Sequence, residues 1–211
     1  ISACTGIWTS NLYGCSPITV HDNIQHISSS ATGINSIAWG TGTTASDNYS
    51  HAEGYYTTAS GYASHAEGYL TTASGTYSHS GGKGLNSSNR IIARGKTSFV
   101  HFEQTVNSGI IGAVGDNSAI LGGTDHNIED NATSSGIFAG ANNIINNGVL
   151  RSVVLGGANI TGTTSDTVYV PNLNIGTAPL DNTLTQILSR DSSDGTIKYR
   201  DVASIISAAT S

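Results

Sequence analysis

The sequence predicts an all-β protein built as a parallel β-roll, or solenoid, in which 14-residue coils are followed by 17-residue coils. Two observations carry this prediction. Residues 50–63 and 64–77 form a tandem repeat in which eleven of the fourteen positions are identical. A second, longer register relates three apolar stretches that begin at Ser118, Ser135 and Ser152. Self-similarity at a fixed period is typical of stacked repeats, each of which buries its inner face only against its neighbours.

The 14-residue period extends beyond the tandem copies. Glycines at this spacing each close a Ser-x-small-x-Gly unit: Gly40, Gly54, Gly68 and Gly82. A Thr-Ala-Ser cluster keeps the same period and begins at Thr44, Thr58 and Thr72. Each coil therefore holds two five-residue stretches of alternating character, which as strands would be about 15 Å long, and two short turns. Helical repeats are excluded, because their units need about 30 residues or more.

The 17-residue coils carry an Asn-Ile pair after each apolar stretch, at Asn127-Ile128, Asn143-Ile144 and Asn159-Ile160. The three extra residues per coil are most simply placed in one enlarged turn. Two segments outside the strict register, 97–100 and 108–112, look like related strands. One continuous roll is therefore expected, with the short coils first and the wide coils second.

Three zones are expected along the chain: a β lead-in over 1–33, the β-roll over 34–162 and a C-terminal segment over 163–211. In the last zone, residues 186–190 and 196–200 alternate like two strands, and Asp194-Gly195 supplies a hairpin turn. One hairpin is marginal alone, so we expect it to pack against further copies of itself.

The lead-in contains both cysteines, Cys4 and Cys15. They form either one disulfide in an oxidising compartment or two buried free thiols on adjacent strands. Two thiols without further ligands at zinc spacing make a poor metal site. The chain has no methionine and begins at Ile1, which predicts a processed product or a section of something larger.

Composition excludes several classes of function. Only 10% of the residues are charged, and the net charge of −6 leaves no basic patch, so nucleic acid binding is not expected. No apolar run approaches the roughly 18 residues of a spanning helix, so membrane insertion is not expected either.

The segment Ser36-Ile37-Ala38-Trp39-Gly40 and the two SHAEG copies resemble the head domain of YadA-type trimeric autotransporter adhesins, which repeats a Ser-Val-Ala-Ile-Gly-like pentad. The resemblance is specific over 36–82 and looser over 97–160. It implies a left-handed parallel β-roll and an obligate trimer of chains joined side by side. The SHAEG form is similar to head-like segments of phage tail and head fibres. Three stretches between 168 and 200 are similar to a segment near the ends of virion fibre proteins.

A recurrent His-x-Glu pattern supplies a candidate trimer seam, the surface along which three chains would meet: His51, Glu53, His65, Glu67 and His79. Alternate residues of a strand share a face, so His51 and Glu53 point away from Ser50, Ala52 and Gly54, which suit the interior of a narrow coil. A His–Glu ladder between chains would pair these charges, and protonation of the histidines should strengthen it. The alternatives are a solvated face and a metal-binding ring of histidines. Nothing else fixes a metal geometry, so no metal or cofactor is assigned.

Tyrosines gather in the short coils, and four of them form the candidate recognition surface: Tyr55, Tyr56, Tyr62 and Tyr69. Aromatic side chains are enriched at recognition surfaces and can stack on sugars, so a glycan or receptor contact is predicted. The alternative is that these rings cover the edges of a thin roll.

No catalytic residue is assigned, because the chain has no nucleophile elbow, metalloprotease motif, P-loop or nicotinamide fingerprint. Asp125, Glu129 and Asp130 form the one dense acidic group, beside His126. A carboxylate pair there could support glycoside cleavage, but a solvated acidic turn is the preferred interpretation.

The sequence therefore predicts a structural and adhesive section of a homotrimeric viral fibre, a tail or head fibre of a phage. Its partners would be its own copies, a host-cell receptor or glycan, and other fibre or tail proteins of the virion. The alternatives are the head of a bacterial trimeric autotransporter adhesin at the cell surface and, ranked lower, a polysaccharide-degrading fibre enzyme. No enzymatic activity is expected.

Overall fold

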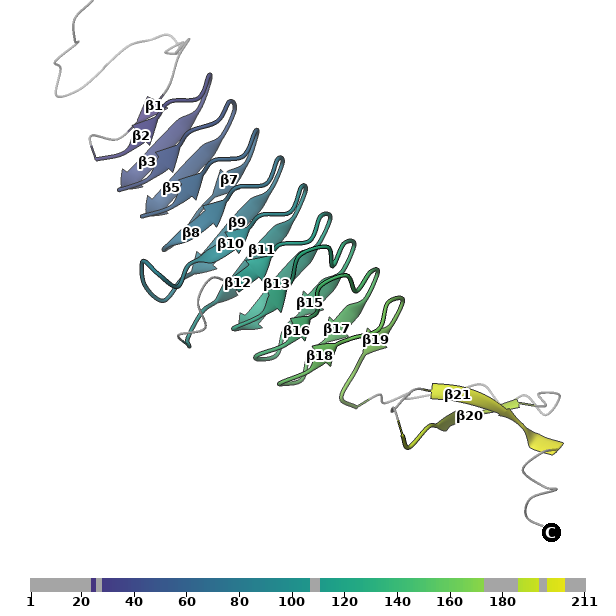
Figure 1. The fold of residues 1–211 in the computed structure, drawn as a ribbon. Helices are drawn as coiled ribbons and strands as arrows, with labels where there is room; N and C mark the ends of the chain where they lie inside the picture. Colours follow the sequence, from purple (N-terminus) through teal and green to yellow (C-terminus); the bar gives the residue numbers. More distant parts are fainter. Residues whose placement is uncertain (1–23, 26–27, 107–110, 173–185, 194–196, 204–211) are drawn as a thin grey trace, which may run out of the picture. The chain divides into compact units, whose positions relative to one another are not determined.

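The computed structural model describes residues 24–25, 28–106, 111–172, 186–193 and 197–203. The chain divides into two compact units, Ile1–Pro171 and Asn172–Ser211. In the first unit, the chain winds into a parallel β-solenoid whose strands are shared between two sheets (Figure 1). The all-β class and the parallel stacking of coils predicted from the repeats are confirmed.

Among the described residues, the first wall of the solenoid, sheet A, has ten parallel strands. In spatial order they are β1 (Ile24–Gln25), β3 (Ile37–Thr41), β5 (His51–Tyr55), β7 (His65–Ala66), β9 (His79–Lys83), β11 (Phe99–Glu103), β13 (Ala119–Thr124), β15 (Gly136–Phe138), β17 (Val153–Leu155) and β19 (Val168–Tyr169). The second wall, sheet B, has nine: β2 (Ser30–Ala31), β4 (Thr44–Ala45), β6 (Thr58–Ala59), β8 (Thr71–Ala73), β10 (Ile91–Ala93), β12 (Ile111–Ala113), β14 (Asn127–Ile128), β16 (Ile144–Ile145) and β18 (Thr161–Gly162).

The pairing of strands measures the length of each coil. His51 pairs with His65, fourteen residues further on, and Gly136 pairs with Val153, seventeen residues further on. Both predicted periods are therefore present, in the predicted order. The turn that returns the chain from sheet B to sheet A spans 60–64 in a short coil and 129–135 in a wide coil. This turn takes up two of the three extra residues, and the third lies in the other half of the coil rather than in the same turn as predicted.

Two still longer coils lie between these zones, and the sequence did not predict them. Phe99 pairs with His79 on one side and with Ala119 on the other, a spacing of twenty in each direction. In the first of these coils, the extra residues lie between β9 and β10, where Asn86 and Asn89 form a bridge across a tight loop. The long coils therefore begin with an insertion on the turn from sheet A to sheet B.

The segments 97–100 and 108–112, predicted as strands of one kind, belong to different walls. Phe99 begins β11 in sheet A, whereas Ile111 begins β12 in sheet B, where it pairs with Ile91. An apolar stretch alone does not reveal the wall to which it belongs, because both walls present apolar side chains to the interior of the long coils.

The solenoid is longer than the predicted span of 34–162. At its start, β1 pairs with β3 and β2 pairs with β4, and at its end β19 pairs with β17. In the second unit, β20 (Gln186–Arg190) pairs antiparallel with β21 (Ile197–Asp201). The predicted turn at Asp194-Gly195 lies outside the described residues, as do Cys4 and Cys15, so the hairpin and the thiol alternatives stay predictions.

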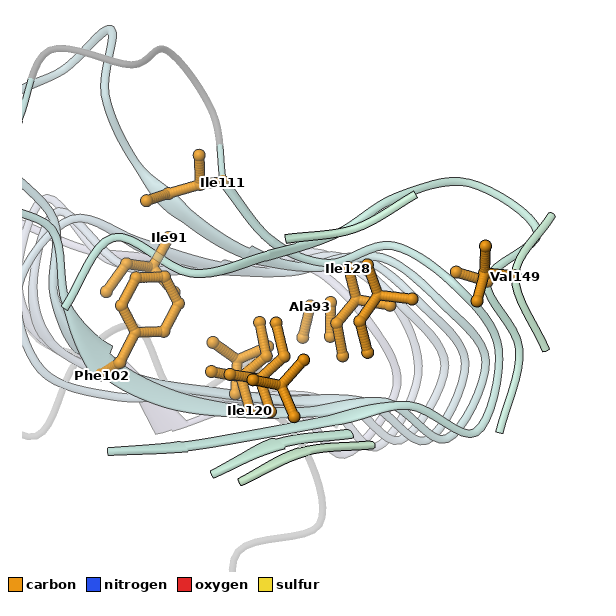
Figure 2. Close-up of a cluster of buried hydrophobic side chains, with 13 residues drawn as sticks. Ile91, Ala93, Phe102, Ile111, Ile120, Ile128 and Val149 are labelled. Atoms are coloured by element: carbon orange, nitrogen blue, oxygen red, sulfur yellow. The ribbon is translucent and has the colours of Figure 1, made fainter. Parts of the chain in front are cut away.

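The interior changes in character along the solenoid. Alanines from both walls fill the short coils: Ala31, Ala38, Ala45, Ala52, Ala59, Ala66 and Ala73. In sheet A the change to valine and isoleucine begins at Val100 on β11, whereas sheet B keeps alanine through Ala113 and changes at Ile128 on β14. Figure 2 shows Ile120 and Ile128 entering the interior from opposite walls. Phe102 and Val149 lie toward the two ends of the flattened coil. Small side chains and short coils occur together because a close-packed interior leaves no room for larger groups.

The Asn-Ile pairs of successive 17-residue coils are not in register, because their spacing is 16 residues and each pair is shifted by one position from the pair before it. Sheet B pairs Asn127 with Ile144, so Asn143 takes the place of His126 in the preceding coil. Asn143 is fully buried. Its amide donates to two backbone carbonyls at 3.2 Å and accepts the Ile160 N–H at 2.9 Å. The buried amide of Asn143 is therefore tolerated because its hydrogen bonds are made.

The glycines at 14-residue spacing have a steric cause. Gly54 has a φ of 110°, and a Cβ atom there would lie 2.2 Å from the carbonyl oxygen of Gly68 in the next coil. Gly54 is also exposed, whereas the strand alternation predicted an inward position. The close approach of backbones from successive coils therefore requires glycine at this corner.

Candidate functional site

The outer face of sheet A carries two rows of side chains, and each coil contributes one residue to each row. Its members on the described strands and just beyond them are Ile37, Trp39, His51, Glu53, His65, Glu67, His79, Phe99, His101, Leu121, Phe138, Val153, Leu155, Val168 and Val170. Ala52 and Ala66 point inward and are fully buried. The alternation therefore places the histidines and glutamates outside, as the sequence predicts.

The five predicted seam residues lie together on the short-coil end of this face. Glu53 lies between two imidazoles, with carboxylate oxygens 3.9 Å from Nε2 of His51 and 3.6 Å from Nε2 of His65. The rings of these two histidines stack, with centroids 4.7 Å apart and planes 8° from parallel. Glu67 Oε1 lies 3.2 Å from Nε2 of His79 in the next coil. The pattern therefore forms a ladder of alternating imidazole and carboxylate groups within one chain.

Burial, rather than pairing with glutamate, sets the direction of the pKa shifts of His51 and His79. Desolvation lowers the pKa of His51 below its ordinary value, and the neighbouring His65 lowers it further, against the attraction of Glu53. The pKa of His79 is lowered by the same two causes, with Glu67 opposing them. Neutral imidazole is therefore favoured at these positions near pH 7. This runs against the expectation that protonation would strengthen the ladder.

In the 20-residue coils and the 17-residue coils that follow them, the outer face of sheet A is mainly apolar. Its exposed large side chains keep between 36% and 59% of their surface accessible: Phe99, Leu121, Phe138, Leu155, Val168 and Val170. Trp39 adds a further exposed ring at the start of the face. A row of this kind, continued over successive coils, is uncommon on a monomeric soluble surface and is typical of interaction sites.

The outer face of sheet B has a different character. In the short coils it presents threonines at successive steps, namely Thr44, Thr58 and Thr72, which are partly buried. Side chains of this kind are compatible with water. The two walls of the solenoid therefore differ in what they offer to a partner.

The predicted recognition tyrosines divide between two edges of the solenoid. Tyr55 and Tyr69 stack with centroids 5.3 Å apart and planes 3° from parallel, and Tyr56 packs edge-on against Tyr55 at 4.6 Å. Tyr62 instead lies between Tyr49 and Tyr77, at 5.5 and 5.7 Å, on the turn that leads back to sheet A. Three of the four predicted residues therefore form one surface and Tyr62 belongs to another.

The three grouped tyrosines line a pocket of about 270 Å³ at the turn from sheet A to sheet B. Its other lining residues are Leu70, Leu85, Asn86, Ser87 and Arg90. The guanidinium of Arg90 donates to the hydroxyls of Thr72 and Thr58, at 3.1 and 3.2 Å. Burial lowers the pKa of Arg90, although an arginine keeps its charge. The pocket therefore combines aromatic faces with a fixed positive charge.

The acidic group beside His126 does not converge on one point. Asp125 accepts the backbone N–H groups of Thr105 and Val106, at 2.7 and 3.1 Å. Glu129 accepts the backbone N–H of Asn147 at 2.9 Å, and Asp130 pairs with the guanidinium of Arg94 at 3.1 Å. Each carboxylate therefore fixes a different part of the fold, and the paired arrangement needed for glycoside cleavage is not formed by these three side chains.

Two residues of these surfaces escaped the sequence analysis. His101 continues the ladder, but its partner in the preceding coil is Gly81, so its spacing departs from the 14-residue period and no Ser-His motif marks it. Alignment of the alternating segment that begins at Ser98 with the SHAEG strands would have found it. Arg90 lies in the insertion of the first long coil, for which the repeats offer no signal.

No protein-family model matches this chain, and no curated protein matches it. Among the described residues, no helix is long and apolar enough to cross a membrane. The fold and the surfaces above are therefore the basis for a functional assignment.

Proposed function

We propose that three copies of this chain associate through the outer face of sheet A and form a structural and adhesive section of a viral fibre. The observation that supports the proposal most directly is the continuous two-part face itself. Its side chains are mainly apolar in the 17- and 20-residue coils and mainly histidine and glutamate in the 14-residue coils. Each coil adds one position to each row of the face. The left-handed winding, the threefold symmetry and the place in a phage tail or head fibre come from the resemblance to YadA-type heads and fibre segments.

A copy of the same chain is the partner that fits this face best. Successive strands of a sheet lie about 4.8 Å apart, so a parallel copy in register would present the same chemistry at each level. Apolar steps would then meet apolar steps, and imidazole–carboxylate steps would meet their equivalents. A contact of this kind closes into a ring when rotation about a single axis brings the last copy back to the first.

The contact with the host belongs, in this proposal, to the pocket formed by Tyr55, Tyr56 and Tyr69. It lies on the turn from sheet A to sheet B and leaves the proposed interface free. Aromatic faces that stack on sugar rings, next to a positive charge on Arg90, suit a glycan or a glycosylated receptor. The interaction is tested by binding to immobilised host-surface glycans, with Tyr69→Ala expected to lose binding and Tyr77→Ala, on the other edge, expected to keep it.

The trimer is tested by the solution mass of the chain from light scattering over a range of dilutions. The expected mass is three times 21.6 kDa. Leu121→Asp introduces a charge into the apolar part of the outer face of sheet A, where the side chain is 43% exposed, and should shift the protein toward monomer. Leu85→Asp is the matched control, because Leu85 is 37% exposed but lies on a turn. A wild-type monomer, or equal effects of both variants, would exclude the proposed interface.

A further inference from the structure

Three side chains from successive coils converge on the outer face of sheet A. They are Glu67, immediately after β7, His79 on β9 and His101 on β11. One carboxylate oxygen, Oε1 of Glu67, lies 3.2 Å from Nε2 of His79 and 3.9 Å from Nδ1 of His101. All three donor atoms lie within 4.8 Å of one another.

The space between these donors exists because Gly81 has no side chain. Gly81 is paired with His101 in sheet A, on the row that carries Glu53 and Glu67 in the earlier coils. A Cβ atom built at Gly81 would lie 2.7 Å from Nδ1 of His101 and 3.1 Å from Oε1 of Glu67. The glycine therefore leaves open the volume toward which the imidazole and the carboxylate point.

We propose that Glu67, His79 and His101 bind a divalent transition-metal ion, with zinc as the best match. Two imidazoles and one carboxylate are a donor set that zinc takes at open sites, with bonds of about 2.0–2.1 Å. A tetrahedral site with such bonds has donor atoms about 3.3 Å apart. The Glu67–His79 separation of 3.2 Å already fits this value, whereas Nδ1 of the exposed His101 ring lies 3.9 Å from Glu67 Oε1 and would move closer on binding.

The neighbouring cluster of His51, Glu53 and His65 is a weaker candidate for the same chemistry. There the two imidazoles approach different oxygens of Glu53, at 3.9 and 3.6 Å, and their rings stack face to face. No glycine opens a space between them. The metal is therefore assigned to the Glu67 site alone.

A metal at this position would join three coils across the point where the coil length changes. Glu67 belongs to the last of the short coils, whereas His79 and His101 lie on the two strands that bound the first long coil. All three donors come from one chain, so binding does not require the proposed trimer. A bound ion would also stabilise the fold by mass action, and the stabilisation would grow with metal concentration.

The experiment uses the full chain with its thiols alkylated, so that Cys4 and Cys15 do not compete for the metal. Zinc binding is followed by calorimetry, and cobalt binding by the visible absorption that reports tetrahedral coordination. Three variants are compared with the wild type. Glu67→Gln removes a donor, Gly81→Ala fills the space without removing one, and Glu103→Gln is the control, because Glu103 pairs with Lys83 at 2.7 Å outside the cluster.

The expected result is one saturable zinc equivalent and a tetrahedral cobalt spectrum in the wild type and in Glu103→Gln. Glu67→Gln and Gly81→Ala should weaken binding by at least about tenfold, since the loss of a mere outer-shell contact already costs about 10- to 100-fold. Equal binding by Glu67→Gln and Glu103→Gln would overturn the proposal. So would the absence of saturable binding in the wild type. Neither result bears on the solution mass, so this site and the proposed trimer fail independently.

Discussion

Replacement of Ile137 by alanine tests whether the 17-residue coils depend on a close-packed interior. Ile137 is fully buried on β15, between Ile120 of the preceding coil and Val154 of the following coil. The substitution removes three carbon atoms, worth about 0.8 kcal/mol each in transfer free energy, or about 2.4 kcal/mol together. The strands on either side are held by backbone hydrogen bonds, so the cavity cannot close and adds a further term. The expected total loss of stability is about 3–4 kcal/mol.

The assay is urea unfolding followed by circular dichroism, at one protein concentration, because any self-association contributes to the apparent stability. Ile144→Ala is the matched control, since Ile144 lies on β16 with its side chain on the partly exposed outer side of sheet B. It should cost about 1 kcal/mol, in proportion to its smaller buried area. If Ile137→Ala cost no more than Ile144→Ala, the assignment of the interior would be refuted.

Two further predictions concern the corners and the buried polar ladder. Gly54→Ala should destabilise the fold by more than Gly148→Ala in thermal unfolding. Both glycines have positive φ, but only at Gly54 would the added Cβ atom meet the next coil, 2.2 Å from the carbonyl oxygen of Gly68. Equal losses would contradict the steric argument. Burial lowers the pKa of His126 below its value of 6.5 in an unfolded chain, so its neutral form is native and the folded state should lose stability as the pH falls below about 6.5. Urea titrations should show a smaller loss between pH 7 and 5 for His126→Asn, and an unchanged pH dependence in this variant would count against the assignment.

Much of the candidate site follows from the repeats. The SHAEG copies place His51 and Glu53 on one side of a strand and Ala52 on the other, because side chains alternate across a strand. That rule needs no knowledge of the rest of the chain. The same reasoning identified the small interior of the short coils, since five-residue strands joined by short turns leave room only for alanine.

Where the period changes, the repeats no longer show which residues of successive coils are neighbours. The insertion between β9 and β10 breaks the 14-residue spacing before His101, so the fixed period did not assign this residue to the His–Glu row. The one-residue error at Asn143 has a similar origin, because Asn and Ile occur on both sides of the wall and composition alone does not set the register. Arg90, just before β10, donates hydrogen bonds to two preceding coils, and no local pattern predicts such a contact.

The repeats are enough to predict the parallel solenoid, the 14- and 17-residue coils and the outward position of the histidines and glutamates. These follow from periodicity, which is a local property of the chain. Only the tertiary structure decided that Glu67, His79 and His101 meet over Gly81, and that Tyr62 lies apart from Tyr55. Such meetings depend on how coils of different length are stacked, because hydrogen bonds between coils, rather than distance along the chain, fix which side chains become neighbours.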